Sequence, residues 1–351
     1  MRPRTWRLRR AHAAGLATIA VACGFAATAA FSDQRAPGNF AAASTRVADV
    51  TPTSYPGLLA SYDFTWGNGV ESQAADLTPT WRANKVTQYG LVVERYVLTD
   101  GTGTTANDQA GVNVIVGDAD TFQVRGELLY GAFTNYPTRL NGSLDVAGAS
   151  GHFKYDAGFV QTGINGAPAA ADHLINTAGA GLQFGNMTGR LGWASKFTSA
   201  YVAGELSNVS DGNRHYFDEF GANQDLGLIP FDVVVGAFVN TSGYRFTYPY
   251  PQSGYYSYSA QERQALKAAV RYPLGRHFDL SAIGIAGTSR TRVISGFGYS
   301  EQSYQQFAPA LVYSNAGMQV SASGKFAQYL GGTYVLNYVS NEAAIAVRLR
   351  L

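Results

Sequence analysis

The sequence has little cysteine, little charge and no long apolar run beyond its first thirty residues. Its 351 residues include one cysteine, Cys23, which excludes a disulfide scaffold and any cysteine-based zinc site. Charged residues make up 14% of the chain, well below the roughly 25% of ordinary soluble domains. The absence of a long apolar run after residue 31 excludes a bundle of membrane helices. What is abundant is Gly (40), Tyr (22) and Phe (19), which favours an all-β chain whose outer surface contacts something other than water.

The net charge of +2 comes from the N-terminus. Five of the 26 basic residues are arginines within residues 1–10, so the rest of the chain holds 21 basic against 24 acidic side chains. A basic nucleic-acid-binding surface is therefore not expected. No His, Asp and Glu cluster has metal-ligand spacing, and no cofactor is expected.

Residues 1–30 have the plan of a secretory signal peptide. Arginines are followed by an apolar stretch at 13–26 and by Ala27-Thr28-Ala29, which offers small residues for cleavage. Two alternatives stay open: an uncleaved anchor helix, and a lipoprotein modified at Cys23, although Ala20 occupies the position where a lipobox has Leu. Residues 31–56 are rich in Ala, Ser, Thr and Pro and are expected to form a flexible periplasmic leader.

From about residue 57 to the end, small or polar residues alternate with apolar ones over segments of about ten residues. In the last segment the apolar set is Ala343, Ile345, Val347, Leu349 and Leu351. Such alternation places one set of side chains on each face of a strand. A secreted β-sandwich also alternates. A transmembrane antiparallel β-barrel over residues 57–351 is favoured because there is an export signal, the turns are polar and Gly-rich, and the last strand ends at the last residue.

About sixteen strands are expected, within a range of 14 to 18. The expected segments are 76–85, 87–98, 108–117, 120–132, 137–147, 151–163, 174–184, 187–196, 198–207, 213–225, 231–247, 260–272, 277–292, 304–314, 317–329 and 333–351. A seventeenth candidate, 58–66, breaks the even number that bacterial barrels have. It is therefore a plug or leader, or one of the other divisions is false.

Turn lengths give the orientation, because such barrels have short periplasmic turns and longer external loops. Residues 273–276 and 315–317 fit short turns, whereas 248–259 and 293–303 fit external loops. The rule fails at 99–107 and 164–173, two polar stretches that this division of strands places on the short-turn side.

About sixteen strands leave room for an aqueous lumen, so transport is the default function and the lumenal side chains set selectivity. The expected inward basic residues are Arg82, Arg125, Arg190, Arg263, Lys267, Arg271, Lys325, Arg348 and Arg350. Glu94, Glu127, Glu205 and Glu342 oppose them. These charges either pair across neighbouring strands and hold water, or make a mildly cationic path for anions or hydrated sugars. Their inward placement follows from the cost of a charge on the lipid face, about 2–4 kcal/mol for Arg or Lys at mid-depth.

Residues 244–258 are dense in aromatic side chains. Tyrosine can stack on a pyranose ring and hydrogen-bond through its hydroxyl, so Tyr255, Tyr256 and Tyr258, near the expected loop tip, are candidate sugar contacts. Tyr244, Phe246 and Tyr248 fit equally well an aromatic girdle at the membrane interface.

Two loop motifs resemble a known family. Gly254-Tyr255-Tyr256-Ser257-Tyr258-Ser259-Ala260-Gln261 resembles the Gly-Tyr-Tyr/Phe-Ser-Pro-Gln turn of exopolysaccharide export barrels, especially the cellulose type, and residues 298–304 form a weaker copy. Ser210-Asp211-Gly212-Asn213-Arg214 is similar to a hairpin of poly-N-acetylglucosamine export porins. The proline of that turn is absent from both Tyr-Ser turns of this sequence. The leader is too short to hold one 34-residue repeat, so the helical repeat domain that usually precedes such barrels is not expected here.

The resemblance implies an outer-membrane channel for passive export of an exopolysaccharide. A general small-solute porin and a non-conducting structural or adhesive barrel remain alternatives. Expected partners are outer-membrane lipid and the barrel assembly machinery, and the resemblance adds a polysaccharide and a periplasmic or inner-membrane glycan synthase complex. The protein is not expected to be an enzyme: the one conceivable pair, Ser210 and His215, is brought together only by proximity in a hairpin.

Overall fold

The computed structural model describes residues 56–67, 69–118, 121–163, 177–248, 253, 255, 257–293, 298–331 and 338–351. The expected signal peptide and nearly all of the expected leader lie outside the described residues. The strands are β1 (Gly57–Gly67), β2 (Val70–Arg82), β3 (Thr87–Asp100), β4 (Gly103–Asp118), β5 (Phe122–Phe133), β6 (Arg139–Ser150), β7 (Phe153–Thr162), β8 (Phe184–Ala194), β9 (Thr198–Val209), β10 (Arg214–Asp225), β11 (Asp232–Tyr244), β12 (Ala260–Pro273), β13 (Phe278–Arg292), β14 (Ser300–Ser314), β15 (Met318–Leu330) and β16 (Tyr338–Arg350).

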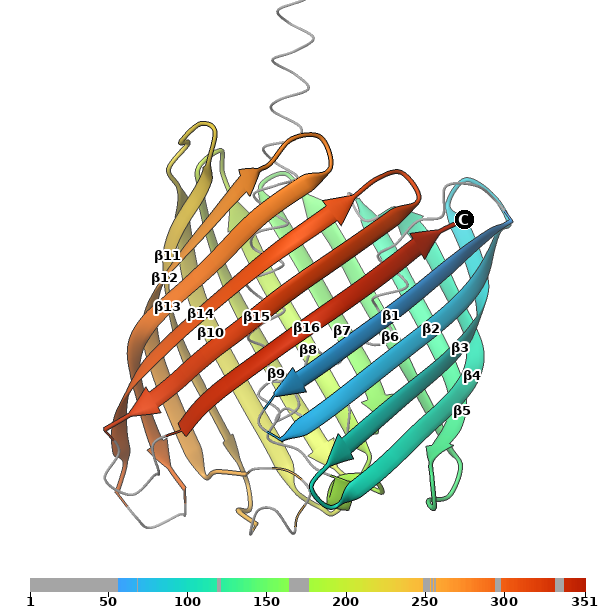
Figure 1. Ribbon diagram of the computed structural model, residues 1–351, viewed down its shortest axis with the longest axis horizontal. Coiled ribbons are helices and arrows are strands. Elements are labelled where there is room, and N and C mark those ends of the chain that lie inside the picture. The colour runs from blue at the N-terminus through green and yellow to red at the C-terminus, as the bar shows by residue number, and fades with distance from the viewer. Residues whose placement is uncertain are drawn as a thin grey trace, which may run out of the picture.

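These sixteen strands form one closed antiparallel barrel in which each strand pairs with its neighbours in sequence, as Figure 1 shows. The first and last strands close it, with Leu59 opposite Arg350 and Gly67 opposite Glu342. Leu58 and Leu351 exchange two backbone hydrogen bonds, of 2.8 and 2.9 Å. Closure leaves no strand edge unpaired, which is the condition for backbone in a hydrocarbon environment. The predicted fold class and strand number are confirmed. No helix among the described residues is long and apolar enough to cross a membrane.

The alternation in the sequence follows the two faces of the wall. In β10, Phe220 is 56% exposed, whereas its neighbour Glu219 is 4% exposed. The outward set consists mainly of Leu, Val, Phe and Tyr, and the inward set is rich in Asn, Gln, Ser, Thr and charged residues. A β-strand repeats every two residues, so one pattern supplies both a lipid-compatible outer surface and a polar lumen.

The strand count of sixteen conceals two compensating errors in the sequence-based division. The segment 58–66, which was expected to be a plug or leader unless another division was false, is β1 and completes the barrel. The expected strand 174–184 is wrong over its described part: residues 177–179 form a short 3-10 helix and β8 begins only at Phe184. Alternation over a short Ala- and Gly-rich stretch does not distinguish a strand from a loop.

The same false strand explains the two exceptions to the turn rule. The start of β1 and the last residue, Leu351, share one end of the barrel, the turn end (upper edge in Figure 1). The same end holds the short connections 83–86, 119–121, 151–152, 195–197, 226–231, 274–277 and 315–317. At the opposite, loop end lie the long connections 163–183 and 245–259. Most of 99–107 belongs to β3 and β4, and the two-residue turn between them, 101–102, is at the loop end. The other exception, 164–173, is part of the connection 163–183 and lies outside the described residues. The turn end is the periplasmic one by the length rule.

Aromatic side chains gather on the outer surface near the turn end. Phe231 stacks on Tyr272 with ring centroids 4.9 Å apart, and Phe278 packs on Tyr313 at 5.0 Å. Trp81 stacks on Tyr89 at 5.8 Å. Aromatic girdles of this kind mark the membrane interface of outer-membrane barrels.

Candidate functional site: the lumen and its external lid

All nine basic residues expected to face the lumen lie on the inward face of the strands. Each alternates with outward apolar neighbours, as Lys267 does with Leu266 and Ala268. Contacts between distant strands show which face is concave: Lys267 on β12 lies 5.3 Å from the ring of Tyr201 on β9. Arg263 on β12 lies 5.3 Å from the ring of Tyr329 on β15. Side chains three strands apart meet only on the inside of a curved wall.

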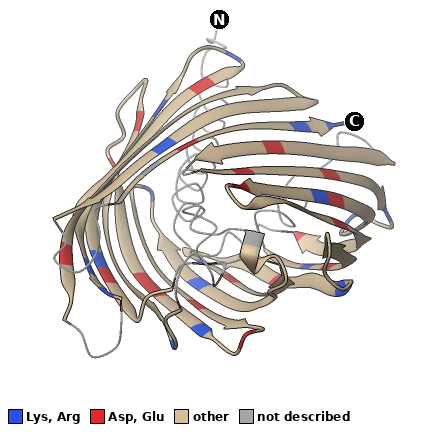
Figure 2. Cartoon of the chain, turned by 60° about the horizontal axis from the view of Figure 1, so that its bottom comes forward, with Lys and Arg blue, Asp and Glu red and all other residues tan. Residues whose placement is uncertain are grey.

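Several of the inward charges have partners on neighbouring strands. Arg271 Nη2 lies 3.0 Å from Asp279 Oδ2, and Lys325 Nζ lies 3.4 Å from Glu342 Oε1. Arg348 donates to Gln319 on β15 at 3.1 Å, whereas Arg125 donates to Gln123 on its own strand. Arg190 lies over the ring of Tyr201 at 4.6 Å, and Arg82 is the last residue of β2, on the same face as Asp76. Figure 2 accordingly shows charged residues as separate bands around the wall.

The acidic residues expected in the lumen also face inward. Gln109 donates to Glu94 at 2.7 Å, and Ser207 donates to Glu205 at 2.5 Å. Glu127 pairs in register with Asn113 and is 9% exposed. Sequence reasoning gave the lumen a mildly cationic character, but Asp63, Asp76, Asp145 and Glu219 add to the acidic set. The inward face therefore carries charges of both signs in similar number.

The hairpin between β9 and β10 holds the β11–β12 connection through one buried asparagine. Asn213, 1% exposed, donates from Nδ2 to the carbonyl of Phe246 at 2.8 Å and to the hydroxyl of Tyr255 at 3.0 Å. Its Oδ1 accepts from the backbone N–H of Phe246 at 2.9 Å. The Tyr255 hydroxyl donates to Asp211 Oδ2 at 2.8 Å. We refer to Asp211, Asn213 and Tyr255 as the latch.

The same hairpin also holds the end of the β7–β8 connection. The backbone N–H of Ser210 donates to the carbonyl of Gln183, and the Ser210 hydroxyl accepts from the Gln183 N–H, both at 2.9 Å. Two loop-end connections are thus fastened to one four-residue turn. The two family-like motifs, some forty residues apart in sequence, meet here as one structural unit, which explains what their residues do locally.

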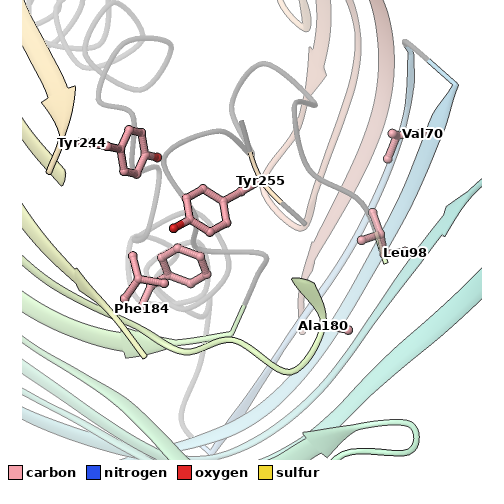
Figure 3. Close-up of a cluster of buried hydrophobic side chains, with 7 residues drawn as sticks. Val70, Leu98, Ala180, Phe184, Tyr244 and Tyr255 are labelled. Atoms are coloured by element: carbon pink, nitrogen blue, oxygen red, sulfur yellow. The ribbon is translucent and has the colours of Figure 1, made fainter. Parts of the chain in front are cut away.

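A buried apolar cluster spans the mouth at the loop end (Figure 3). It contains Leu98 at the end of β3, Ala180 in the β7–β8 connection, Phe184 at the start of β8, and Tyr244 and Tyr255. Strands β3 and β11 are eight positions apart in a sixteen-strand barrel, so they stand on opposite sides of the wall. The β7–β8 and β11–β12 connections therefore bridge the mouth. We call their described parts the lid: residues 177–183, 245–248, Tyr255 and 257–259.

Two aromatic residues at the loop end, Tyr255 and Tyr244, do not lie where the sequence placed them. Tyr255 is fully buried against Phe184 and Tyr244, with ring centroids 5.8 and 5.5 Å away, so it offers no ring face to a sugar in this conformation. Tyr256 lies outside the described residues. Tyr258 is half-buried and its hydroxyl is 2.8 Å from that of Ser242. Tyr244 faces the lumen rather than a membrane girdle and is 3% exposed.

Burial sets the protonation of the latch tyrosine. Loss of water around the hydroxyl, together with the nearby Asp211 carboxylate, raises the pKa of Tyr255 well above its ordinary value of 10.0. The hydroxyl therefore stays a hydrogen-bond donor throughout the physiological range. The only sequence signal for the binding of Tyr255 was the Ser-Asp-Gly-Asn hairpin. Those residues are common in turns, so the hairpin alone does not indicate that it binds another loop.

The residues considered for catalysis, Ser210 and His215, make local structural contacts. Ser210 is engaged by Gln183, and His215 is fully buried, 4.6 Å from the ring of Tyr244 and 3.8 Å from Glu205. Among the described residues, no group of three or more His, Cys, Asp and Glu could hold a metal ion. A groove of about 1080 Å³ crosses β10–β16, lined by outward side chains such as Leu266, Phe307 and Phe326. It belongs to the outer face and not to the lumen.

Comparison with known proteins gives the class. No family model and no curated protein matches the chain. Among solved structures, a bacterial polysaccharide outer membrane secretin superposes with a TM-score of 0.67 at 11% identity, covering 84% of this chain and 98% of that one. OccK3 of Pseudomonas aeruginosa (TM-score 0.46, 9% identity, 84% and 94% covered) and OmpF of Salmonella typhi (0.46, 10%, 84% and 96%) are more distant. The chain therefore has the closed β-barrel fold of an outer-membrane protein.

Proposed function

We propose that this protein is an outer-membrane channel for the passive export of an exopolysaccharide. The observation that carries the proposal is the polar inward face of a closed sixteen-strand barrel, a size that leaves an aqueous lumen. Export needs no chemistry from the wall: hydroxyl, amide and charged side chains replace part of the hydration of a moving sugar chain.

The fold shared with a polysaccharide secretin and the two loop motifs support this solute over others. The protein would be delivered by a cleaved signal peptide, inserted by the barrel assembly machinery, and fed by a periplasmic or inner-membrane glycan synthase complex. In the conformation described here the lid narrows the external mouth, so export would require the lid to move outward. Lid movement is the step on which the latch would act.

A general small-solute porin is the second candidate. The favouring observation is the mixture of inward charges of both signs, which holds water and small ions as well as sugar. The inward-folded lid differs from a charge-dense constriction, because the described cluster that spans the mouth is apolar and aromatic.

Planar-bilayer recording of the refolded, full-length mature protein in 1 M KCl separates these functions. Export predicts steady current that is blocked, in a concentration-dependent manner, by neutral oligosaccharides of six or more units and not by a monosaccharide. A porin predicts current with equal, weak effects of both sugars. Absence of current in the wild type and in an Asn213→Ala variant would overturn the channel proposal and favour a structural barrel.

A further inference from the structure

The inward charges are unevenly distributed along the barrel axis. The register fixes which residues face the lumen on every strand, and the strand bounds fix how far each lies from the turn end. We compare the inward residues among the five residues of each strand nearest the turn end, called the inner zone, with all other inward residues of the described strands, called the outer zone.

The inner zone is predominantly basic. On β2, β5, β7 and β8 it holds Arg82, Arg125, Lys154 and Arg190. On β12 and β16 it holds Arg271, Arg348 and Arg350. Its acidic residues are Asp156, Asp225, Asp232 and Asp279. Seven basic against four acidic side chains give the described inner zone a formal charge of +3.

The outer zone has the opposite sign. Its acidic residues on β1, β2, β3 and β5 are Asp63, Asp76, Glu94, Asp100 and Glu127. Those on β6, β9, β10 and β16 are Asp145, Glu205, Glu219 and Glu342. Its basic residues are Arg139, Arg263, Lys267 and Lys325. Nine acidic against four basic side chains give the described outer zone a formal charge of −5.

Fixed charge of this kind acts on the whole width of a water-filled pore at moderate salt. The screening length is about 10 Å at 0.1 M salt and about 3 Å at 1 M, so at the lower salt the wall charge reaches far into the lumen. Mobile anions collect in the inner zone and mobile cations in the outer zone. A voltage that drives anions in through the inner zone and cations in through the outer zone therefore gives a larger current than a voltage of the opposite sign.

We infer that the lumen reverses its charge along the axis, and that this reversal makes the channel rectify ionic current and favour uncharged polysaccharide over chains of either charge. A polyanion is attracted at the turn end and repelled further out. A polycation is repelled on entering from the turn end. An uncharged chain meets neither barrier. The substrate class rests on the proposed export function, whereas rectification requires only an open lumen.

The first test is the wild-type current at +100 and −100 mV in 0.1 M and 1 M KCl, with protein inserted in one orientation. We expect at least a twofold difference between polarities at 0.1 M, with the larger current when anions enter from the turn end, and a ratio near one at 1 M. A linear response at 0.1 M overturns the inference. If the wild-type lid passes no current, the same comparison is made in Asn213→Ala, and if neither conducts the inference fails together with the channel proposal.

The second test assigns the effect to the inner zone. Combined Arg82→Gln, Arg125→Gln and Arg348→Gln changes should abolish rectification and shift the reversal potential toward cation selectivity. The matched control is Arg95→Gln, an exposed arginine on the outer face that pairs with Asp108 at 3.4 Å; it should leave both readouts unchanged. Heat-dependent gel migration verifies folding of each variant, and an effect of equal size in the control contradicts the assignment.

The third test concerns the substrate. Liposomes holding the protein should take up a neutral hexasaccharide at least tenfold faster than an oligouronate or a fully deacetylated amino-sugar oligomer of equal length at 0.1 M salt, and the ratio should shrink at 1 M. Equal uptake of all three with rectification intact overturns the substrate class alone. Block by neutral oligosaccharide at 1 M salt reports on the export proposal independently.

Discussion

The two ends of the barrel solve the same problem of chain reversal in opposite ways. At the turn end, short connections are closed by local contacts: Asn315 Oδ1 accepts from the backbone N–H of Gly317 at 3.0 Å and of Met318 at 2.8 Å. At the loop end, Asn213 uses its side chain to hold a segment more than thirty residues away. The same residue type thus stabilises a local turn at one end and a tertiary contact at the other. Only the second bears on whether the mouth is open.

The largest effect is expected from Asn213→Ala. The change removes the partner of the Phe246 N–H and carbonyl and one of the two partners of the Tyr255 hydroxyl, at about 0.5–1.5 kcal/mol for each hydrogen bond lost. Each 1.4 kcal/mol shifts a closed–open equilibrium about tenfold, so single-channel open probability should rise by about an order of magnitude or more. The control is Asn208→Ala, an exposed asparagine near the same hairpin. Unchanged gating in Asn213→Ala with normal folding would show that the latch does not hold the lid.

Tyr255→Phe sharpens the comparison by removing one oxygen atom and keeping the ring. The ring still packs on Phe184 and Tyr244, but the hydrogen bonds to Asp211 and Asn213 are lost. The effect on open probability should have the same direction as that of Asn213→Ala and be smaller. Hydrogen exchange of residues 245–248 should accelerate as well. A variant that gates like the wild type would assign the lid's stability to apolar packing alone.

Asn315→Ala is the corresponding test at the turn end, because it also removes hydrogen bonds made by an asparagine side chain. Loss of two local hydrogen bonds costs about 0.5–1.5 kcal/mol each and should lower the urea midpoint for unfolding modestly. Conductance and gating should stay at wild-type values because the turn does not cross the lumen. A clear change in gating would mean that the two ends are coupled through the wall.

The smallest effect is expected from pH. Because the pKa of Tyr255 is raised in the folded lid above its ordinary value of 10.0, the folded state binds the proton more tightly, and stability falls as pH rises above about 10. The contribution of Tyr255 to open probability should therefore stay constant from pH 7 to about pH 9.5, and open probability should increase above pH 10. Tyr255→Phe should lack that alkaline increase; its presence in the variant would assign the titration to another group.

Most of the fold could be predicted from the alternation of side chains along the strands, and the errors arose in single segments. The alternation around Lys267 or Glu342 identified inward and outward faces because a strand has a fixed period of two. It failed at 174–184, where small residues fit either a strand or a loop, and that single error inverted the assigned side of every upstream connection. The even strand number indicated that either 58–66 or another division was false, but it did not show which, because leaving out any one segment restores the parity.

The lid illustrates a different limit. Tyr255 was singled out correctly as a notable residue, but its expected exposure was wrong because nothing local to residues 244–258 reveals that Asp211 and Asn213 bind it. The interaction depends on two turns meeting over the lumen, at a sequence separation of 42 to 44 residues. Spacing within either motif contains no information about such a contact.

What the sequence determined by itself was the wall: the two faces, the polar lumen and the closed-barrel class follow from side-chain periodicity and from the cost of charge in hydrocarbon. The tertiary structure decided the closing partner of β16, the side of each connection and the latch. These depend on which distant segments are brought together once the cylinder closes, and periodicity along a single strand does not record the identity of a strand's remote neighbours.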